Sequence, residues 1–282
     1  MSDARRAGAS FMDFRLEPIC REVAEDFVAA RHYSAVMPRL TRHYLGCFKD
    51  DALVGALTLG WGTRPLHTIR RLFPTLSTEN YLEIGKMCMD ETMPRNCESQ
   101  MLALSVRWLR ENTDALFLFT WADGIVGKPG YVYQAANFLY GGFIVTDTYV
   151  TEHGEKVHPR TMQGLMANER ETEYGSRPTR EQLREHRISR VKGRQFQYIY
   201  PLTREAKKLL PTSTVSWGLK YPKHTDLVWS VRGPDEAEYR QTTEMPFTLT
   251  KHTEYNRKHG FRSKVAHEED DLAWLTSGLD TE

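Results

Sequence analysis

Cysteines are few in this sequence, and long apolar segments are missing. The four cysteines, Cys20, Cys47, Cys88 and Cys97, include no pair at the short spacing of a zinc knuckle or of a small disulfide framework. We therefore expect reduced thiols that are mostly buried. No run of about eighteen apolar residues occurs, and residues 1–6 lack an apolar signal core. We expect a cytoplasmic protein that is neither membrane-spanning nor secreted.

Net charge is also small, but it is unevenly distributed. The 282 residues carry a formal net charge of +1 and are 40% hydrophobic, which suits one large domain or one domain with additions. Residues 177–223 contain twelve Lys or Arg against three Glu, whereas residues 233–282 are mainly acidic. The basic segment, taken as 177–224, is therefore either a solvated face or a surface that contacts phosphate groups.

One stretch in the first half of the chain shows the clearest order of secondary structure. Residues 81–89 alternate in polarity, as in a strand. Asn96 is expected to cap a helix over 98–111, in which apolar residues recur three and four apart. Residues 115–121 form a continuous apolar run, which is typical of a strand buried on both faces. Asp123 thus follows the carboxyl end of a central strand, where ligands usually bind.

The remaining elements complete a mixed sheet. In chain order they are a helix over 16–30, a hairpin of strands 44–48 and 52–61, an aromatic helix with Tyr133, Asn137 and Tyr140 on one face, strands over 142–149 and 195–200, and short helices over 178–186 and 203–210. The sheet is expected to open antiparallel and to be parallel in its middle. The predicted fold class is α/β, of the α+β kind, with a C-terminal extension.

This order of elements resembles that of the acetyltransferase superfamily, whose GNAT-like mixed sheet has splayed central parallel strands. In that fold the strands admit the pantetheine of acetyl-coenzyme A, and backbone N–H groups at a helix start hold its pyrophosphate. The equivalent loop here, residues 93–99, lacks the glycine pair of most such enzymes. The resemblance therefore assigns the pyrophosphate to Arg95, Asn96 and Ser99. An ordinary capped helix start is the alternative.

A narrower resemblance lies in a series of short motifs. In chain order they cover residues 32–34, 96–99, 122–123, 130–140, 157–161, 198–202 and 221–223. The same order occurs in the Mom family of bacteriophage DNA-modification proteins, and the block from Asp123 to Gln134 with its Tyr-Gln-Ala-x-Asn core is the most specific part. The resemblance covers about residues 28–225.

This resemblance implies an activity and a setting. Mom-family proteins add a carbamoylmethyl (acetamido) group to the exocyclic amine of adenine in DNA, which blocks restriction enzymes. By resemblance, residues 1–225 form the catalytic domain, residues 226–282 form an acidic extension, and the substrate is double-stranded DNA. The setting implied is the cytoplasm of a bacterial host, with the protein encoded by a phage. The donor implied is acetyl-coenzyme A or a related acyl donor, although acetyl-coenzyme A cannot supply the amide nitrogen.

The reaction needs a base, because the lone pair of an adenine amino group is delocalised into the ring. Asp123 is the candidate base, and a side chain that caps the following turn is its alternative. In the acetyltransferase superfamily the next helix faces the coenzyme thiol. That resemblance assigns Tyr133 to protonating a leaving group and Asn137 to orienting the donor, against plain core packing of the ring. Ser99 is expected to hydrogen-bond the donor or the base, or else only its own helix start.

A base inside a duplex must be flipped out and stacked on an aromatic wall. His32, Tyr33 and Trp121 are the candidate stacking surfaces, together with Trp61. The side chains expected to contact phosphate are His158, Arg160, Arg190, Lys192 and Arg194. We predict no metal. A metal site formed by His32, Asp123 and His158 is the alternative, which no spacing supports.

Two functions of other classes stay open. One is an acetyltransferase acting on a small amine or an already modified nucleotide, which needs the coenzyme but no basic face. The other is a DNA-binding protein without chemistry, which needs the basic face but neither Asp123 nor Tyr133. The sequence also leaves the oligomeric state open, a homodimer included.

Overall fold

The computed structural model describes residues 13–32, 37–157, 159, 162 and 178–249. Within these ranges no helix is long and apolar enough to cross a membrane. All four cysteines are free thiols, so the prediction of reduced cysteines is confirmed. Cys47 and Cys97 are buried as expected, whereas Cys20 is exposed.

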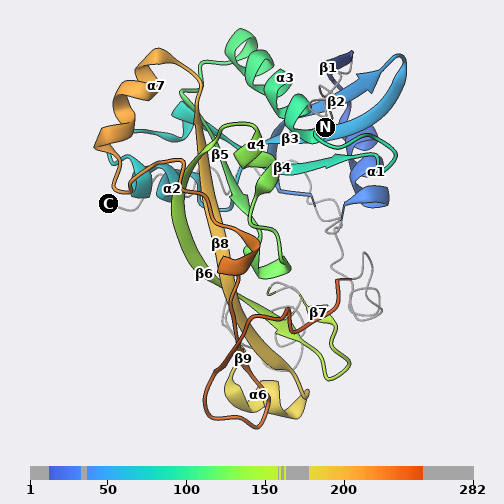
Figure 1. The fold of residues 1–282 in the computed structure, drawn as a ribbon, viewed down its shortest axis with the longest axis vertical. Coiled ribbons are helices and arrows are strands. Elements are labelled where there is room, and N and C mark those ends of the chain that lie inside the picture. Colours follow the sequence, from blue (N-terminus) through green and yellow to red (C-terminus); the bar gives the residue numbers. More distant parts are fainter. Residues whose placement is uncertain (1–12, 33–36, 158, 160–161, 163–177, 250–282) are drawn as a thin grey trace, which may run out of the picture.

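The described part of the chain is built around a single mixed sheet (Figure 1). Its strands are β1 (Phe14–Pro18), β2 (Leu40–Lys49), β3 (Ala52–Trp61), β4 (Tyr81–Met89), β5 (Phe117–Ala122), β6 (Leu139–Val150), β7 (Lys156–Val157), β8 (Ser189–Pro201), β9 (Trp229–Arg232) and β10 (Arg240–Thr242). They lie in the order β1-β2-β3-β4-β5-β8-β6-β7, with β9 beside β8 and β10 beside β9. The predicted α/β class with a mixed sheet is confirmed.

The pair β4 and β5 is parallel, while the other strand pairs described are antiparallel. The two strands are in register only from Tyr81 and Phe117 to Glu83 and Phe119. Beyond that point β4 continues to Met89 along β3, and β5 continues to Ala122 along β8. The strands therefore separate in the middle of the sheet, as the resemblance to the acetyltransferase superfamily implied for the central parallel pair.

Helices cover both faces of this sheet. They are α1 (Arg21–Arg31), α2 (Pro65–Leu72), α3 (Cys97–Asn112), α4 (Tyr131–Ala135), α6 (Arg180–Glu185) and α7 (Arg204–Leu209). The apolar stripe of α3, with Leu102 and Leu109, packs against Leu57 and Leu118 on one face. On the opposite face α2 and α7 pack against Phe117, Phe119 and Ile199 of β5 and β8. Burial on both faces explains why β5 is a continuous apolar run.

A long arm formed by β6 and β8 extends away from helices α1 to α4 and α7 (Figure 1). Its far end carries β7, β9 and α6, and it has a small core of its own around Tyr149, Leu183 and Ile188. The segment after residue 225 begins in this region, because β9 pairs with β8. The division of the chain at residue 225 stays a prediction, but residues as far as Phe247 contribute to the main core.

Two predicted helices are wrong in part. The expected helix over 16–30 is shortened by β1, since residues 14–18 pair with β2 and Pro18 disfavours helix for the residue before it. The expected helix that carried Tyr133, Asn137 and Tyr140 ends at Ala135. Asn137 adopts a left-handed conformation, and Tyr140 lies in β6 opposite Tyr198.

Candidate active site

The separation of β4 and β5 opens a cleft of about 740 Å³. One wall is the diverging part of β4, Glu83–Met89, and the other is the end of β5 with Asp123. The loop from Gly127 to Tyr133 closes a third side, and Arg31 and His32 at the end of α1 lie on the rim. The cleft therefore brings together residues from four separate stretches of the chain.

Asp123 lies in this cleft directly after β5, where the sequence placed it. Its Oδ1 accepts a hydrogen bond of 3.0 Å from Nε2 of Gln195 on β8. The following turn is closed by its backbone oxygen, which accepts from the N–H groups of Val126 and Lys128. The side chain itself makes no capping hydrogen bond. The carboxylate is thus directed to the cleft rather than used to cap the turn.

The loop after Asp123 is held by two contacts, one with β8 and one with Trp229. Ile125 packs on Gly193 of β8, where a Cβ would lie 2.7 Å from the isoleucine side chain. The backbone oxygen of Ile125 accepts a 2.8 Å hydrogen bond from the indole N–H of buried Trp229. A segment from late in the chain therefore helps to hold the Asp123 loop in place.

The charge of Asp123 acts on three partly buried lysines that the sequence analysis did not single out. Burial lowers the pKa of Lys86 on β4 to about 8, and the charge of Asp123 opposes that decrease. Burial likewise lowers the pKa of Lys128 and of Lys156, again against the charge of Asp123. These side chains come from β4, the loop after β5 and β7, so only the folded chain brings them together.

Tyr133 lines the same cleft from α4. Burial raises the pKa of its hydroxyl to about 12, so the group keeps its proton at neutral pH. Its ring lies 5.5 Å from that of Phe138 and 5.6 Å from that of Tyr198. The ring thus packs in the core while the residue still borders the cleft.

The start of α4 is held by close contacts with β8. Gly130 has φ of +93°, and a Cβ there would lie 2.7 Å from the ring of Tyr198. The hydroxyl of Tyr198 donates to the backbone oxygen of Pro129, and Nε2 of Gln134 donates to that hydroxyl at 3.0 Å. Only glycine fits this approach without strain, which explains the position of Gly130 in the motif.

A second pocket, of about 400 Å³, lies between α3 and α4. It unites three residues predicted to bind the donor, namely Asn96, Ser99 and Asn137. Asn96 occupies the N-cap position in a left-handed conformation without a side-chain cap, so its predicted capping bond is absent. The hydroxyl of Ser99 donates to the Asn96 backbone oxygen at 2.8 Å. Arg95 is exposed beside this helix start.

The stacking candidates are only partly described. His32, Trp61 and Trp121 line the cleft. Tyr33, His158 and Arg160 lie outside the described residues. Among the residues that are described, no group of three His, Cys, Asp or Glu side chains is arranged to hold a metal ion.

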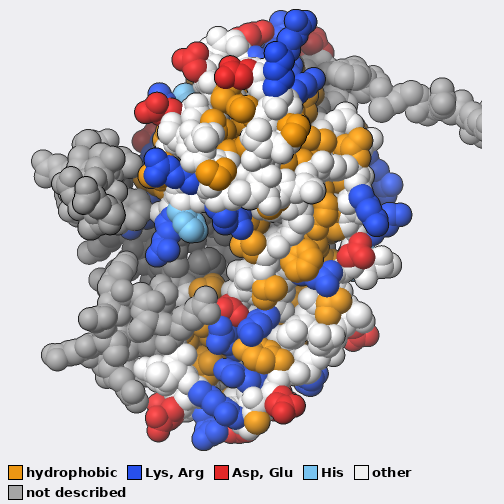
Figure 2. Space-filling model, turned by 90° about the vertical axis from the view of Figure 1, so that its left-hand side faces the viewer, with side chains coloured by type: hydrophobic (Ala, Val, Ile, Leu, Met, Phe, Trp, Pro, Cys, Tyr) orange, Lys and Arg blue, Asp and Glu red, His pale blue; other side chains and the backbone are white. Residues whose placement is uncertain are grey.

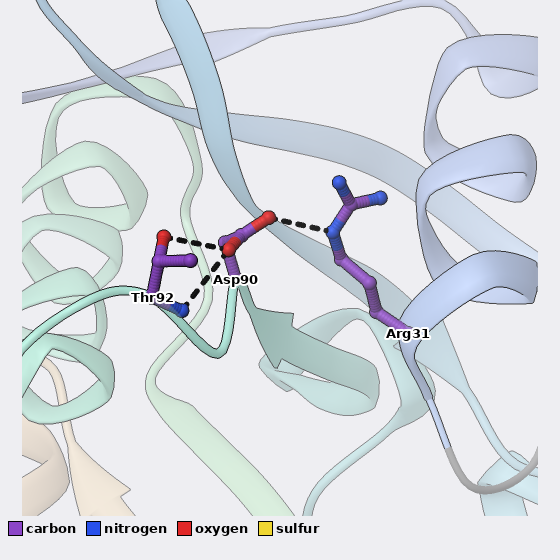
Figure 3. A network of polar contacts seen from close by, with 3 residues as sticks. All are labelled: Arg31, Asp90 and Thr92. Atoms are coloured by element: carbon purple, nitrogen blue, oxygen red, sulfur yellow. Dashed lines mark hydrogen bonds and ion pairs between the residues drawn. The ribbon is translucent and has the colours of Figure 1, made fainter.

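The rim residue Arg31 is anchored to the end of β4 (Figure 3). Its Nε donates to Oδ2 of Asp90 at 3.0 Å, and the other carboxylate oxygen accepts from the backbone and hydroxyl of Thr92 at 3.1 and 2.8 Å. These bonds hold the pKa of Asp90 below its usual range. The network joins the end of α1 to the end of β4, and so fixes one side of the cleft opening.

The predicted basic cluster lies on the arm, along one face of β8. Arg190 forms a partly buried ion pair with Asp147 at 2.8 Å. Nζ of Lys192 lies 4.3 Å from the centre of the Tyr239 ring, and the guanidinium of Arg194 lies 4.5 Å from that of Phe143. Figure 2 shows Lys and Arg side chains gathered on the lower part of the molecule, to which the arm belongs. The cluster is therefore held in place by aromatic and acidic neighbours.

The model of the Mom protein family matches residues 13–223. This chain belongs to the Mom protein family. A curated relative is the methylcarbamoylase mom of Escherichia phage Mu, with 28% identity over 206 residues, which cover 73% of this chain and 82% of that protein. The resemblance inferred from the short motifs is thus confirmed. The matched range, residues 13–223, includes all the residues that line the two pockets.

This Mom-family protein is also similar to solved acetyltransferases. One is an N-acetyltransferase from Staphylococcus aureus Mu50, with 10% identity, a TM-score of 0.35, and coverage of 67% of this chain and 97% of that one. Another is a GNAT family acetyltransferase from Elizabethkingia anophelis with acetyl-CoA bound, with 12% identity, a TM-score of 0.28, and coverage of 67% and 97%.

Proposed function

We propose that this Mom-family protein is a DNA-modifying transferase that adds a carbamoylmethyl group to the exocyclic amine of adenine and thereby protects DNA from restriction. The observation that carries the proposal is the cleft at the separation of β4 and β5, which is lined by both Asp123 and Tyr133. Its volume of about 740 Å³ accommodates a flipped base and the reactive end of a donor. Membership of the Mom family supplies the substrate class.

In this proposal Asp123 accepts the proton that the adenine amine loses as its new bond forms. Gln195 orients the carboxylate through its 3.0 Å hydrogen bond. Tyr133 retains its proton at neutral pH, and in this proposal it gives that proton to the leaving group. Trp121, His32 and Tyr33 offer the surfaces on which the flipped base stacks, and His158 and Arg160 contact the DNA.

The second pocket supports an acyl donor of the coenzyme A class. A pyrophosphate would meet the N-terminus of α3, a helix of 16 residues, next to Arg95, Asn96 and Ser99. Asn137 lines the opposite side of this pocket and would orient the donor. An acyl-coenzyme A would supply an activated carbonyl carbon, so attack by the amine would form an N-acyl bond and release the coenzyme thiol. The methylene link and the amide nitrogen of a carbamoylmethyl group would require a further reaction with a nitrogen-containing co-reactant. The residues present fit such an acyl donor, although this loop lacks the usual glycines.

Nucleoside mass spectrometry of plasmid DNA from expressing cells tests the proposal. A new adenosine species, absent from cells with an empty vector, is the expected result. A glycyl group joined through its carbonyl has the same composition as a carbamoylmethyl group joined through its methylene, so the product is also treated with mild base. Only the acyl-type product is cleaved by base. A new species of another base would favour the acetyltransferase alternative, and unchanged DNA with retained binding would favour a non-catalytic DNA-binding protein.

The donor prediction concerns Arg95. Titration with coenzyme A is expected to raise the melting temperature, since a ligand of the native state stabilises it by about 2.7 kcal/mol at a hundredfold excess over Kd. Arg95→Ala is expected to diminish this rise, because it removes a cation beside the pyrophosphate. Arg70→Ala, which makes the same change of charge at an exposed position of α2, is the control. A flat titration up to millimolar coenzyme would contradict the coenzyme site.

The DNA-binding prediction concerns the arm. Replacement of Arg190, Lys192 and Arg194 by Ala is expected to weaken binding to all sequences alike and to reduce the slope of log affinity against log salt by about 1 for each lost phosphate contact. Arg190 is expected to contribute least, because Asp147 already pairs with it. Fluorescence anisotropy at several salt concentrations measures the slope.

Lys49→Ala is the control for this salt series, since Lys49 lies at the end of β2, far from the arm (Figure 1). It is expected to keep the wild-type slope. A triple variant with the wild-type slope would show that the cluster is a solvated face and that DNA approaches elsewhere.

A further inference from the structure

Glu83 lies where β4 and β5 part. It is the last β4 residue in register with β5, opposite Phe119, and it lines the cleft that opens beyond this point. Its carboxyl group faces the backbone of Gly62, where a Cβ would lie 3.3 and 3.4 Å from the two carboxylate oxygens. The sequence analysis assigned no role to Glu83, because a single Glu in an alternating strand looks like any solvent-facing residue. The fold instead places it at the base of the cleft.

The environment of Glu83 differs from that of Asp123. Burial raises the pKa of Glu83 to about 7, and a hydrogen bond from the backbone of Gly62 opposes the increase. A substantial fraction of this side chain is therefore a neutral acid at neutral pH, with one O–H donor and one carbonyl acceptor. Asp123, in contrast, interacts electrostatically with three lysines, Lys86, Lys128 and Lys156. Two carboxyl groups in one cleft with different surroundings suit two different tasks.

Two fixed tryptophans flank this part of the cleft. The indole N–H of Trp61 donates to the backbone oxygens of Tyr81 and Thr78 at 2.9 and 3.2 Å. The ring of Trp121 lies edge-on to Phe119 at 5.2 Å, and the guanidinium of Arg71 lies 5.5 Å from its centre. Both residues line the cleft, so an aromatic ligand at Glu83 has two tryptophan side chains beside it.

We propose that Glu83 recognises adenine, donating a hydrogen bond to its N1 and accepting one from its amino group. The proposal rests on the proposed function, which brings a flipped adenine into this cleft. The carbonyl oxygen of Glu83 has two lone pairs, so it can accept from Gly62 and from the amine together. The second amino hydrogen stays available to Asp123.

This pairing selects among the bases. Guanine and thymine present a carbonyl oxygen and a ring N–H at the equivalent positions, so both hydrogen bonds would meet the wrong partner. Cytosine offers the same donor and acceptor as adenine but a smaller ring for the tryptophans to contact. Sites built on such paired hydrogen bonds reject an analogue that lacks one of them strongly, because a buried polar group is then left unpaired.

The pairing also gives a direction to the pH dependence. Tyr81 on the same strand interacts with Glu83. The other titratable and charged groups that line the cleft with it are Arg31, His32, Lys86, Cys88, Glu91, Glu98, Asp123, Lys128, Tyr131 and Tyr133. The O–H donor is present below the pKa of Glu83, about 7, and is lost as the pH rises through that value. Recognition of adenine N1 is therefore strong at pH 6 and weak at pH 8.5.

Binding to DNA hairpins that carry one purine opposite an abasic site tests the inference, since such a base is already unpaired. The probes contain adenine, 1-deazaadenine, which lacks the N1 acceptor, or hypoxanthine. At pH 6 the wild-type protein is expected to bind the adenine hairpin roughly 10- to 100-fold more tightly than either analogue. At pH 8.5 this preference is expected to shrink.

Variants of Glu83 test whether the neutral form of its side chain makes the two hydrogen bonds to adenine. Glu83→Gln is expected to keep the preference at both pH values, because an amide carries a donor and an acceptor in the same places and does not titrate. Glu83→Ala is expected to bind the adenine and 1-deazaadenine hairpins equally, because the contact with N1 is then absent from both. Equal affinities for adenine and 1-deazaadenine in the wild-type protein, or a Glu83→Gln variant without preference, would overturn the inference.

The same measurements distinguish a failure of this inference from a failure of the proposed function. A preference for adenine in the hairpins without any modified adenosine in plasmid DNA would contradict the transferase and uphold the recognition by Glu83. Modified adenosine without a preference among the hairpins would uphold the transferase and overturn the role of Glu83.

Discussion

Asp123→Asn is expected to abolish DNA modification while folding and DNA affinity stay almost unchanged. Asparagine preserves the shape of the side chain and an oxygen that can accept from Gln195, but it cannot take the proton of the adenine amine. Loss of general base catalysis is expected to lower the rate by roughly 10²- to 10⁴-fold. Nucleoside mass spectrometry measures the product, and hairpin binding and thermal melting measure affinity and folding.

The matched control is Asp114→Asn. Asp114 is exposed and precedes β5, so the same chemical change is made at the other end of the strand. Its modification level is expected to equal that of the wild-type protein. If Asp123→Asn modified DNA at a near-normal level, the carboxylate would have no part in proton transfer. Its role would then be to balance the charge of the three lysines on which it acts.

Tyr133→Phe is expected to have the second largest effect. The substitution removes only the hydroxyl and keeps the ring contacts with Phe138 and Tyr198, so the fold is expected to persist. Without a proton donor for the leaving group, modification is expected to fall by roughly 10²- to 10⁴-fold. The yield of modified adenosine in plasmid DNA and the melting temperature are the two measurements.

Tyr131→Phe provides the comparison on the same helix. Tyr131 is 53% exposed, and its hydroxyl accepts a 3.0 Å hydrogen bond from the backbone of His224. Loss of that hydroxyl is expected to leave the yield of modified adenosine unchanged. Full activity in Tyr133→Phe would instead assign the ring of Tyr133 to core packing alone.

The part of the site predicted from the sequence is the part set by local patterns. The apolar run that ends at Trp121 has to be a buried strand, so the position of Asp123 followed directly. Asn96 and Ser99 were placed at a helix start by the apolar stripe that follows them, and the structure puts both in one pocket with Asn137. These residues depend on neighbours within a few positions.

The part of the site that the sequence analysis missed depends on the order of the strands in the sheet. β8 inserts between β5 and β6, which brings Gln195 to Asp123 across 72 positions of the chain. The charge of the same carboxylate also acts on Lys156 of β7. No period in the sequence reports such pairings. Tyr140 was misplaced for the same reason, since its pairing with Tyr198 in the sheet overrides a helical pattern that extends no further than Ala135.

The hydrogen bond from Trp229 to Ile125 has a consequence for the limits of the domain. The family match ends at residue 223, yet the indole that fixes the loop after Asp123 comes six residues later. A chain ending at residue 223 would contain every matched position and still lack this support. The part of the chain that supports the loop after Asp123 therefore extends beyond the part by which the family is recognised.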